Sequence, residues 1–162
     1  MAEELVEQWS YDVVDVWRLP YPSGLEAPEC MLRGIGPTER LVRRLFPPTG
    51  PAFCCWFHDG SWSKASEAAI EIVEAETTKG LAGEELVDAV TARAERIESK
   101  WLREAVSGLV DGGEPLHFEG DSGWLRDDRF WIGGRHRAKA MIQQNVRRTV
   151  VMRVDLVDVI RE

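Results

Sequence analysis

A glycine pair stands between an apolar run with strand character, residues 129–132, and a helix-forming segment, residues 136–145. Glycine lets the backbone pass close to a ligand. The start of a helix presents N–H groups that lack intrahelical acceptors, together with the positive end of the helix dipole. Such a junction suits an anion, above all a phosphate. The predicted phosphate- or nucleotide-binding residues are Gly133, Gly134, Arg135, His136 and Arg137.

The charge pattern sets this segment apart from the rest of the chain. The formal net charge is -8, yet residues 133–154 contain no Asp or Glu. This span could bind an anion, or its charge could balance an acidic face elsewhere on the protein. The ordinary alternative is that its arginines are simply solvated on the surface. The acidity of the whole chain argues against non-specific nucleic-acid binding by its entire surface, although not by a local patch.

Length and composition predict a single domain over residues 1–162, with a core of ordinary size. No apolar run approaches the length that a membrane span needs, and the N-terminus lacks a signal-peptide pattern. The chain has 3 cysteines, too few for a disulfide framework. We therefore expect a cytoplasmic protein without a membrane partner.

The first third of the chain predicts two strands and one helix. Residues 11–17 are rich in β-branched and aromatic side chains and indicate a strand. Residues 38–46 have an amphipathic pattern with Pro37 in the first turn, which indicates a short helix. The apolar run at residues 52–57 indicates a buried strand.

Helical periodicity dominates the middle of the chain. Ser63 is the expected N-cap of a first helix, and Gly80 lies just beyond its end. Apolar residues recur at helical spacing over residues 84–107 and indicate a second helix. We expect an antiparallel helical hairpin, inserted over about residues 63–109.

The last third predicts short strands at residues 115–119 and 130–132, the helix at 136–145, and a strand at 149–154. The resulting order indicates an α+β (mixed α/β) domain with a small mixed sheet. In this arrangement the last strand–helix–strand unit would form a right-handed crossover that carries the glycine loop.

The junction resembles the motif of the ParB/sulfiredoxin superfamily over about the last 50 residues. Sulfiredoxins have Gly-Gly-Cys-His-Arg between a strand and a helix, and four of these five positions match. The ParB branch has a related Gly-Glu-Arg-Arg motif, which matches at Gly134 and Arg137. A third group with Asp-Gly-Gln-His-Arg, tied to DNA modification and mobile elements, matches at Gly134, His136 and Arg137.

The resemblance implies a ParB/sulfiredoxin-like fold and a nucleotide-phosphate site, with ATP or CTP as the ligand and Mg²⁺ as its companion. The phosphates would be held by Gly133, Gly134, His136 and Arg137, and Arg135 would add a further positive charge. An activity as an NTPase or phosphotransferase would be compatible with such a site. Asp127 and Asp128 are candidates to approach the Mg²⁺, and solvated turn acids are the ordinary alternative.

One departure from the motif bears on the chemistry. Arg135 stands where sulfiredoxins have their nucleophilic cysteine, and arginine cannot form the thiol intermediate. We therefore expect no sulfiredoxin-type reductase activity. The same position holds Glu in the ParB motif, so hydrolysis by the ParB route is not indicated either. The alternative is a non-catalytic accessory module of a mobile element or defence system that binds DNA, RNA or an acidic protein.

Cys54, Cys55 and His58 are of metal-ligand type. If residues 52–57 form a strand, the two adjacent thiols point to opposite faces and do not converge. The sequence therefore predicts core cysteines and no metal site. A third overall hypothesis is a structural or oligomerising protein in which Arg135 and Arg137 pair with acids of the same chain, such as Asp127 and Asp128.

Overall fold

The computed structural model describes residues 3–22, 24–32, 38, 41, 42, 45, 46, 54–111, 116–118 and 131–160. The strands are β1 (Glu3–Asp15), β2 (His117–Phe118), β3 (Trp131–Gly133) and β4 (Arg148–Ile160). The α-helices are α1 (Glu29–Leu32), α3 (Trp62–Thr78), α4 (Gly83–Ala94), α5 (Lys100–Val110) and α6 (Arg135–Gln143). Two 3-10 turns complete the description, η1 (Val16–Arg18) and η2 (Trp56–His58). The expected α+β domain with a mixed sheet is confirmed.

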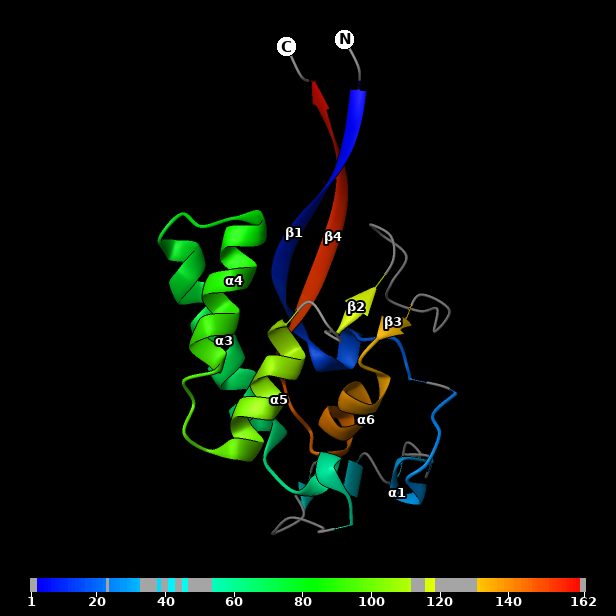
Figure 1. Cartoon of the computed structure of the whole chain (residues 1–162). Helices are drawn as coiled ribbons and strands as arrows, with labels where there is room; N and C mark the ends of the chain where they lie inside the picture. Colours follow the sequence, from blue (N-terminus) through cyan, green and yellow to red (C-terminus); the bar gives the residue numbers. More distant parts are fainter. Residues whose placement is uncertain are drawn as a thin grey trace.

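The sheet has the order β1-β4-β2-β3 and is built on the long antiparallel pair β1 and β4. This pair runs without a break from Glu3 opposite Ile160 to Asp15 opposite Arg148. Its far end, with both termini, projects beyond the helices (Figure 1). The predicted strand at 11–17 is wrong at its last two residues, because the N–H of Val16 bonds to the carbonyl of Arg147 and the chain turns into η1.

The predicted crossover between β3 and β4 is wrong. Strand β2 lies between them, parallel to β4 and antiparallel to β3. The link to β4 is made at His117 opposite Met152, and the N–H of Met152 donates to the carbonyl of Leu116 at 3.0 Å. The parallel connection therefore runs from β2 to β4, and it carries both β3 and α6.

Three helices, rather than the two of the expected hairpin, pack together beside the β1–β4 pair (Figure 1). Helix α3 is capped by Ser61, two residues before the predicted cap, and Ser61 accepts from the N–H of Lys64. The predicted second helix is interrupted between α4 and α5. Ser99 begins α5 by accepting from the N–H of Leu102, which is the role that serine prefers at a helix start.

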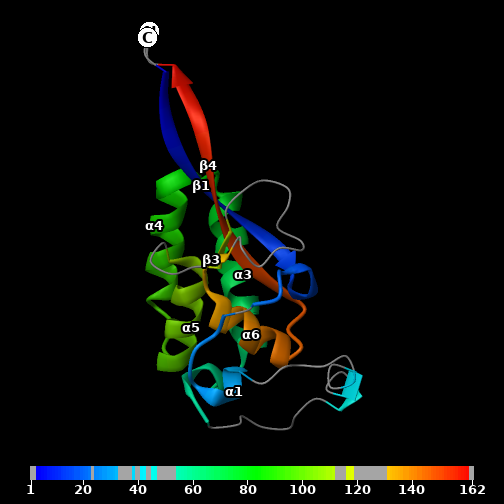
Figure 2. The same ribbon diagram turned by 90° about the vertical axis from the view of Figure 1, so that its right-hand side faces the viewer.

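The core lies between these helices and the sheet. Its fully buried members include Trp62 of α3, Val106 and Leu109 of α5, and Val150 and Met152 of β4. Helix α6 lies at the end of the sheet, above α1, in the turned view (Figure 2). It contacts α1, α3 and both 3-10 turns. Among the described helices, none has the length and apolar character needed to cross a bilayer.

Two further predictions concern the first third of the chain. The predicted strand at 52–57 is wrong over its described part, because Cys54 and Cys55 lie in a turn that leads into η2. Residues 39, 40, 43 and 44 of the predicted helix at 38–46 lie outside the described residues, and residues 38, 41, 42 and 45 are helical. Within it, the N–H of Phe46 donates to the carbonyl of Val42 at 2.8 Å, as in a helical turn.

Candidate functional site: a glycine loop and a cysteine–histidine cluster on one helix

The strand–glycine–helix junction forms as the sequence indicates. Strand β3 ends at Gly133, and Gly134 has a φ of 81° and a ψ of 9°, in the left-handed region. A residue with a Cβ is strained there, which explains the glycine. Gly134 is the N-cap of α6, and its carbonyl accepts the first helical bond from Ala138 at 3.0 Å. The first-turn amides of α6 follow directly, and such amides have no acceptor within their own helix.

The three side chains after the glycines diverge. Successive residues on a helix are about 100° apart around the axis. Arg135 is exposed and reaches Gly24, where an added Cβ would lie 3.0 Å from a guanidinium nitrogen. Arg137 lies against Gly108 of α5, where an added Cβ would lie 2.8 Å from Nε. His136 stacks on Phe57 of η2. The predicted residues therefore share one helical turn, but their side chains contact three different segments.

A buried cation lies one turn further along α6, and the sequence did not single it out. Lys139 is 2% exposed, and its ammonium donates to the hydroxyl of Tyr21 at 2.5 Å. The ammonium also lies 4.7 Å from the centroid of the Tyr21 ring, within cation–π range. No described carboxylate forms an ion pair with Lys139. This charge adds to the positive end of the α6 dipole.

A second group of polar side chains gathers near the other end of α6. Cys30 comes from α1, Cys54 and Cys55 precede η2, and His58 ends it. One ligand atom from each lies within 4.8 Å of every other. The Sγ atoms of Cys30 and Cys55 are 3.4 Å apart, and Nδ1 of His58 is 3.2 Å from Sγ of Cys54. The predicted divergence of the two adjacent thiols is wrong, because a turn replaces the strand and directs both toward His58.

Helix α6 supports this group through adjacent glutamines. Oε1 of Gln143 lies 2.6 Å from Nε2 of His58, and Nε2 of Gln143 donates to the carbonyl of Cys30 at 3.1 Å. Gln144 accepts from the N–H of Trp62 at 2.8 Å and donates to the carbonyl of Gly60 at 3.0 Å. The last residue of η2 and the residues that follow it are therefore hydrogen-bonded to the C-terminal end of α6.

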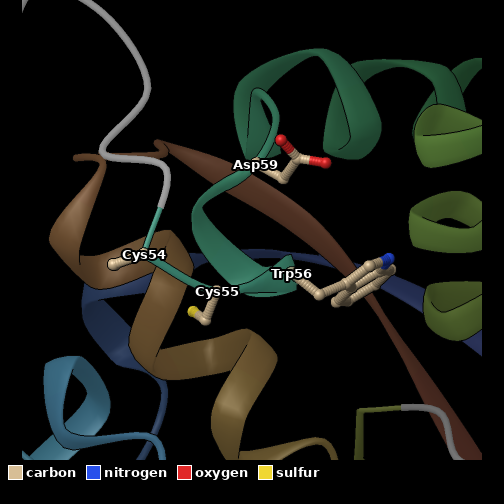
Figure 3. A pocket seen from close by; sticks show the side chains of 4 residues that line it. All are labelled: Cys54, Cys55, Trp56 and Asp59. Carbon is tan, nitrogen blue, oxygen red and sulfur yellow. The ribbon is translucent and has the colours of Figure 1, made fainter.

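The cysteines differ in their access to solvent. Cys54 is exposed, whereas Cys30 and Cys55 are half-buried. A shallow hollow of about 390 Å³ is lined by Cys54, Cys55, Trp56 and Asp59. Figure 3 shows the two cysteines over α6, with Trp56 turned away toward α5. Desolvation, with hydrogen bonds to Cys55 and Cys54, raises the pKa of Cys30 to about 12.

Comparisons with models of protein families, with curated proteins and with solved structures found no match. The function is therefore proposed from the local chemistry of the glycine loop at the start of α6 and the cysteine–histidine cluster near its end. Two other predicted site residues, Asp127 and Asp128, lie outside the described residues. Their predicted ion pairs with Arg135 and Arg137 therefore stay a prediction. Sequence reasoning missed Cys30 and Gln143. The signal available for Cys30 was the cysteine count, since the chain has 3 cysteines and two of them already stood beside His58 in a metal-ligand pattern.

Proposed function

We propose that this chain is a ParB/sulfiredoxin-like domain that binds the phosphate groups of a nucleotide, ATP or CTP, at residues 133–137. The observation that supports the proposal most is the left-handed Gly134, which begins α6 without a side chain over the helix start. A phosphate can therefore approach the first-turn amides closely and meet the positive end of the dipole.

The side chains around the loop support the same ligand. Arg135 is exposed at the helix start, and a guanidinium can hold two phosphate oxygens at once. Nε2 of His136 is buried and has no hydrogen-bond partner among the described residues. An unsatisfied buried polar group costs about 1–3 kcal/mol. A ligand oxygen that accepts from this nitrogen would remove the cost.

The proposed reaction class, if the nucleotide is turned over, is NTP hydrolysis or phosphoryl transfer. A sulfiredoxin-type reduction is not proposed, because Arg135 occupies the position of the nucleophile. Bound Mg²⁺ would neutralise phosphate charge. The groups near the loop are N–H donors and cations, which suit phosphate oxygens. The carboxylates suggested as Mg²⁺ ligands, Asp127 and Asp128, lie outside the described residues.

Calorimetric titration with ATP, CTP, GTP and ADP in the presence of Mg²⁺ tests the proposal. We expect one nucleotide to bind, and Arg135→Ala to weaken it by roughly ten- to a hundredfold, the effect of one charge-assisted hydrogen bond. Arg137→Ala tests the second guanidinium of the motif. Arg147→Ala is the matched control, since this exposed arginine belongs to the same basic segment but lies beyond α6. Absence of binding, or equal binding by all three variants, contradicts the proposal.

A second candidate function is a non-catalytic accessory module that binds DNA, RNA or an acidic protein. The exposure of Arg135, Arg147 and Arg148 in a stretch without acids favours it. Gel shifts with duplex and single-stranded DNA over a range of salt would test the nucleic-acid version. The loss of binding in an Arg147→Ala, Arg148→Ala double variant would support it, and the absence of any shift at low salt would exclude it.

The proposed compartment is the cytoplasm, because the three cysteines are free thiols, as a reducing environment maintains them. By analogy with the family's third group, a mobile element or a defence system is the proposed setting.

A further inference from the structure

We propose that Cys30, Cys54, Cys55 and His58 form a structural zinc site that attaches α1 and the η2 segment to α6. The four residues come from two segments separated by more than twenty positions of sequence, yet their ligand atoms all lie within 4.8 Å of one another. This inference is independent of the nucleotide proposal and uses none of its residues.

Three of the six separations between the ligand atoms are slightly shorter than those in a zinc tetrahedron, and all six are within 4.8 Å. Zinc binds thiolate sulfur at about 2.3 Å and imidazole nitrogen at about 2.0–2.1 Å, so neighbouring ligand atoms lie about 3.5–3.8 Å apart. The separation of the Cys30 and Cys55 sulfurs is 3.4 Å, and Nδ1 of His58 lies 3.2 Å from Sγ of Cys54 and 3.3 Å from Sγ of Cys55. Movements of a few tenths of an ångström would open these contacts to the bonded geometry.

The histidine is held in the tautomer that a metal requires. The amide N–H of Gln143 donates to the carbonyl of Cys30. This bond sets the orientation of the amide, so that Oε1 of Gln143 is the atom that faces Nε2 of His58 and accepts from it. Nε2 of His58 therefore carries the proton, and Nδ1 directs a lone pair at the sulfurs. An outer hydrogen bond of this kind orients a metal-bound histidine and raises its basicity.

The ligand types select the ion and its role. Three thiolates and one imidazole are soft and borderline donors, which favour zinc over magnesium or calcium. Four protein ligands complete a tetrahedron and leave no position for substrate, which is the pattern of a structural site. A disulfide between Cys30 and Cys55 is the competing chemistry, but it would leave the approach of Cys54 and His58 unexplained.

The ion would link two elements that are each only three or four residues long. Cys30 lies in the four-residue helix α1, and none of the three residues of η2 is fully buried. Closing the chain between Cys30 and Cys54 has an entropic cost that a bound ion can offset. Zinc would then hold Phe57, between the ligands, against α6.

The test begins with the full chain purified under reducing conditions. We expect one zinc ion per chain by elemental mass spectrometry, and its release to a chromogenic chelator when a mercurial reagent blocks the thiols. Replacement by cobalt(II) should give the intense visible bands of a tetrahedral site, with sulfur-to-cobalt charge transfer at higher energy. Failure to bind zinc or cobalt after reconstitution would overturn the proposal, as would a Cys30–Cys55 disulfide that persists in reductant.

Variants then assign the ligands. Cys30→Ser, Cys54→Ser and His58→Gln should each lose the wild-type cobalt spectrum. Asp59→Asn is the matched control, because this exposed residue directly follows His58 but is not one of the four clustered ligands, and the variant should retain full metal content. Should a ligand variant fail to fold, the charge-transfer intensity of wild-type cobalt protein still counts the bound thiolates. A cobalt spectrum without sulfur-to-cobalt charge-transfer bands would show that no thiolate is bound and would contradict the site.

Discussion

Phe57 stacks on His136, with ring centroids 5.3 Å apart and an angle of 17° between the rings. Phe57 precedes His58 in η2, and His136 lies in the first turn of α6. The stack therefore joins the cysteine–histidine cluster to the glycine loop. A loss of order in η2 should therefore reduce the order of the first turn of α6, and the reverse should also hold.

Phe57→Leu should lower the free energy of unfolding by about 0.5–1.5 kcal/mol beyond its loss of apolar area, because leucine cannot stack on the imidazole. Phe57→Tyr keeps the ring and is the control. Urea unfolding followed by circular dichroism measures both. Equal stability of the leucine and tyrosine variants would mean that the stack contributes nothing.

Gln143→Leu should weaken zinc binding by about 10- to 100-fold, since it removes the acceptor that fixes the tautomer of His58. Gln144→Leu is the neighbouring control, because its amide bonds to Trp62 and Gly60 instead. Competition with a chelator of known affinity gives both values. A similar loss in the two variants would indicate a general effect of loosening η2.

Gly60→Ala should lower stability by about 1–3 kcal/mol through overpacking. An added Cβ would overlap the indole of Trp101. That ring cannot move freely, because its N–H donates to the carbonyl of Trp56 and it packs on the ring of Trp62. In thermal unfolding, the effect of the alanine should shrink in a Trp101→Leu background. An undiminished effect would place its cause elsewhere.

Gly134→Ala should cost about 1–2 kcal/mol, because its φ of 81° is unfavourable for a residue with a Cβ. Gly134→Asn should cost less, since asparagine tolerates this region. Chemical unfolding gives the two values. We expect the free energy of unfolding to be lowest for the alanine variant, intermediate for the asparagine variant and highest for wild type. Equal stability of the three proteins would contradict this expectation.

Glu76 should make the helical layer sensitive to acid. Its carboxylate is buried and lies 2.6 Å from Lys79 and 2.9 Å from Arg93, so it joins α3 to α4. Hydrogen bonds from Lys79 and then Arg93 lower its pKa below the ordinary 4.5. The resulting stability is complete above the unfolded pKa and is lost as the pH falls through the lower folded value.

Glu76→Gln should therefore be less stable than wild type at neutral pH and should lose less stability between neutral pH and pH values below 4.5. Glu74→Gln, an exposed glutamate of the same helix, is the control. Urea unfolding across this range provides the measurement. Parallel pH profiles for wild type and Glu76→Gln would refute the role given to this carboxylate.

Local sequence determined the features that depend on neighbouring residues. Gly134 is needed where the backbone turns left-handed between β3 and α6, and glycine is the residue that allows it. The β-branched run at 149–154 forms a strand, and the apolar spacing near Ile72 and Val73 forms a helix with a buried face. In each case the preferred local conformation and the tertiary contacts agree.

Tertiary structure decided the rest. An apolar run such as 52–57 has the composition of a buried strand, yet its described part turns at Cys54, because Phe57 packs on α6 and Trp56 on α5 rather than between strands. The approach of Cys30 to Cys55, and of Gln143 to His58 across 85 residues, leaves no periodic pattern in the sequence. These contacts depend on how α1, η2 and α6 pack, and packing is set by side chains that are distant along the chain.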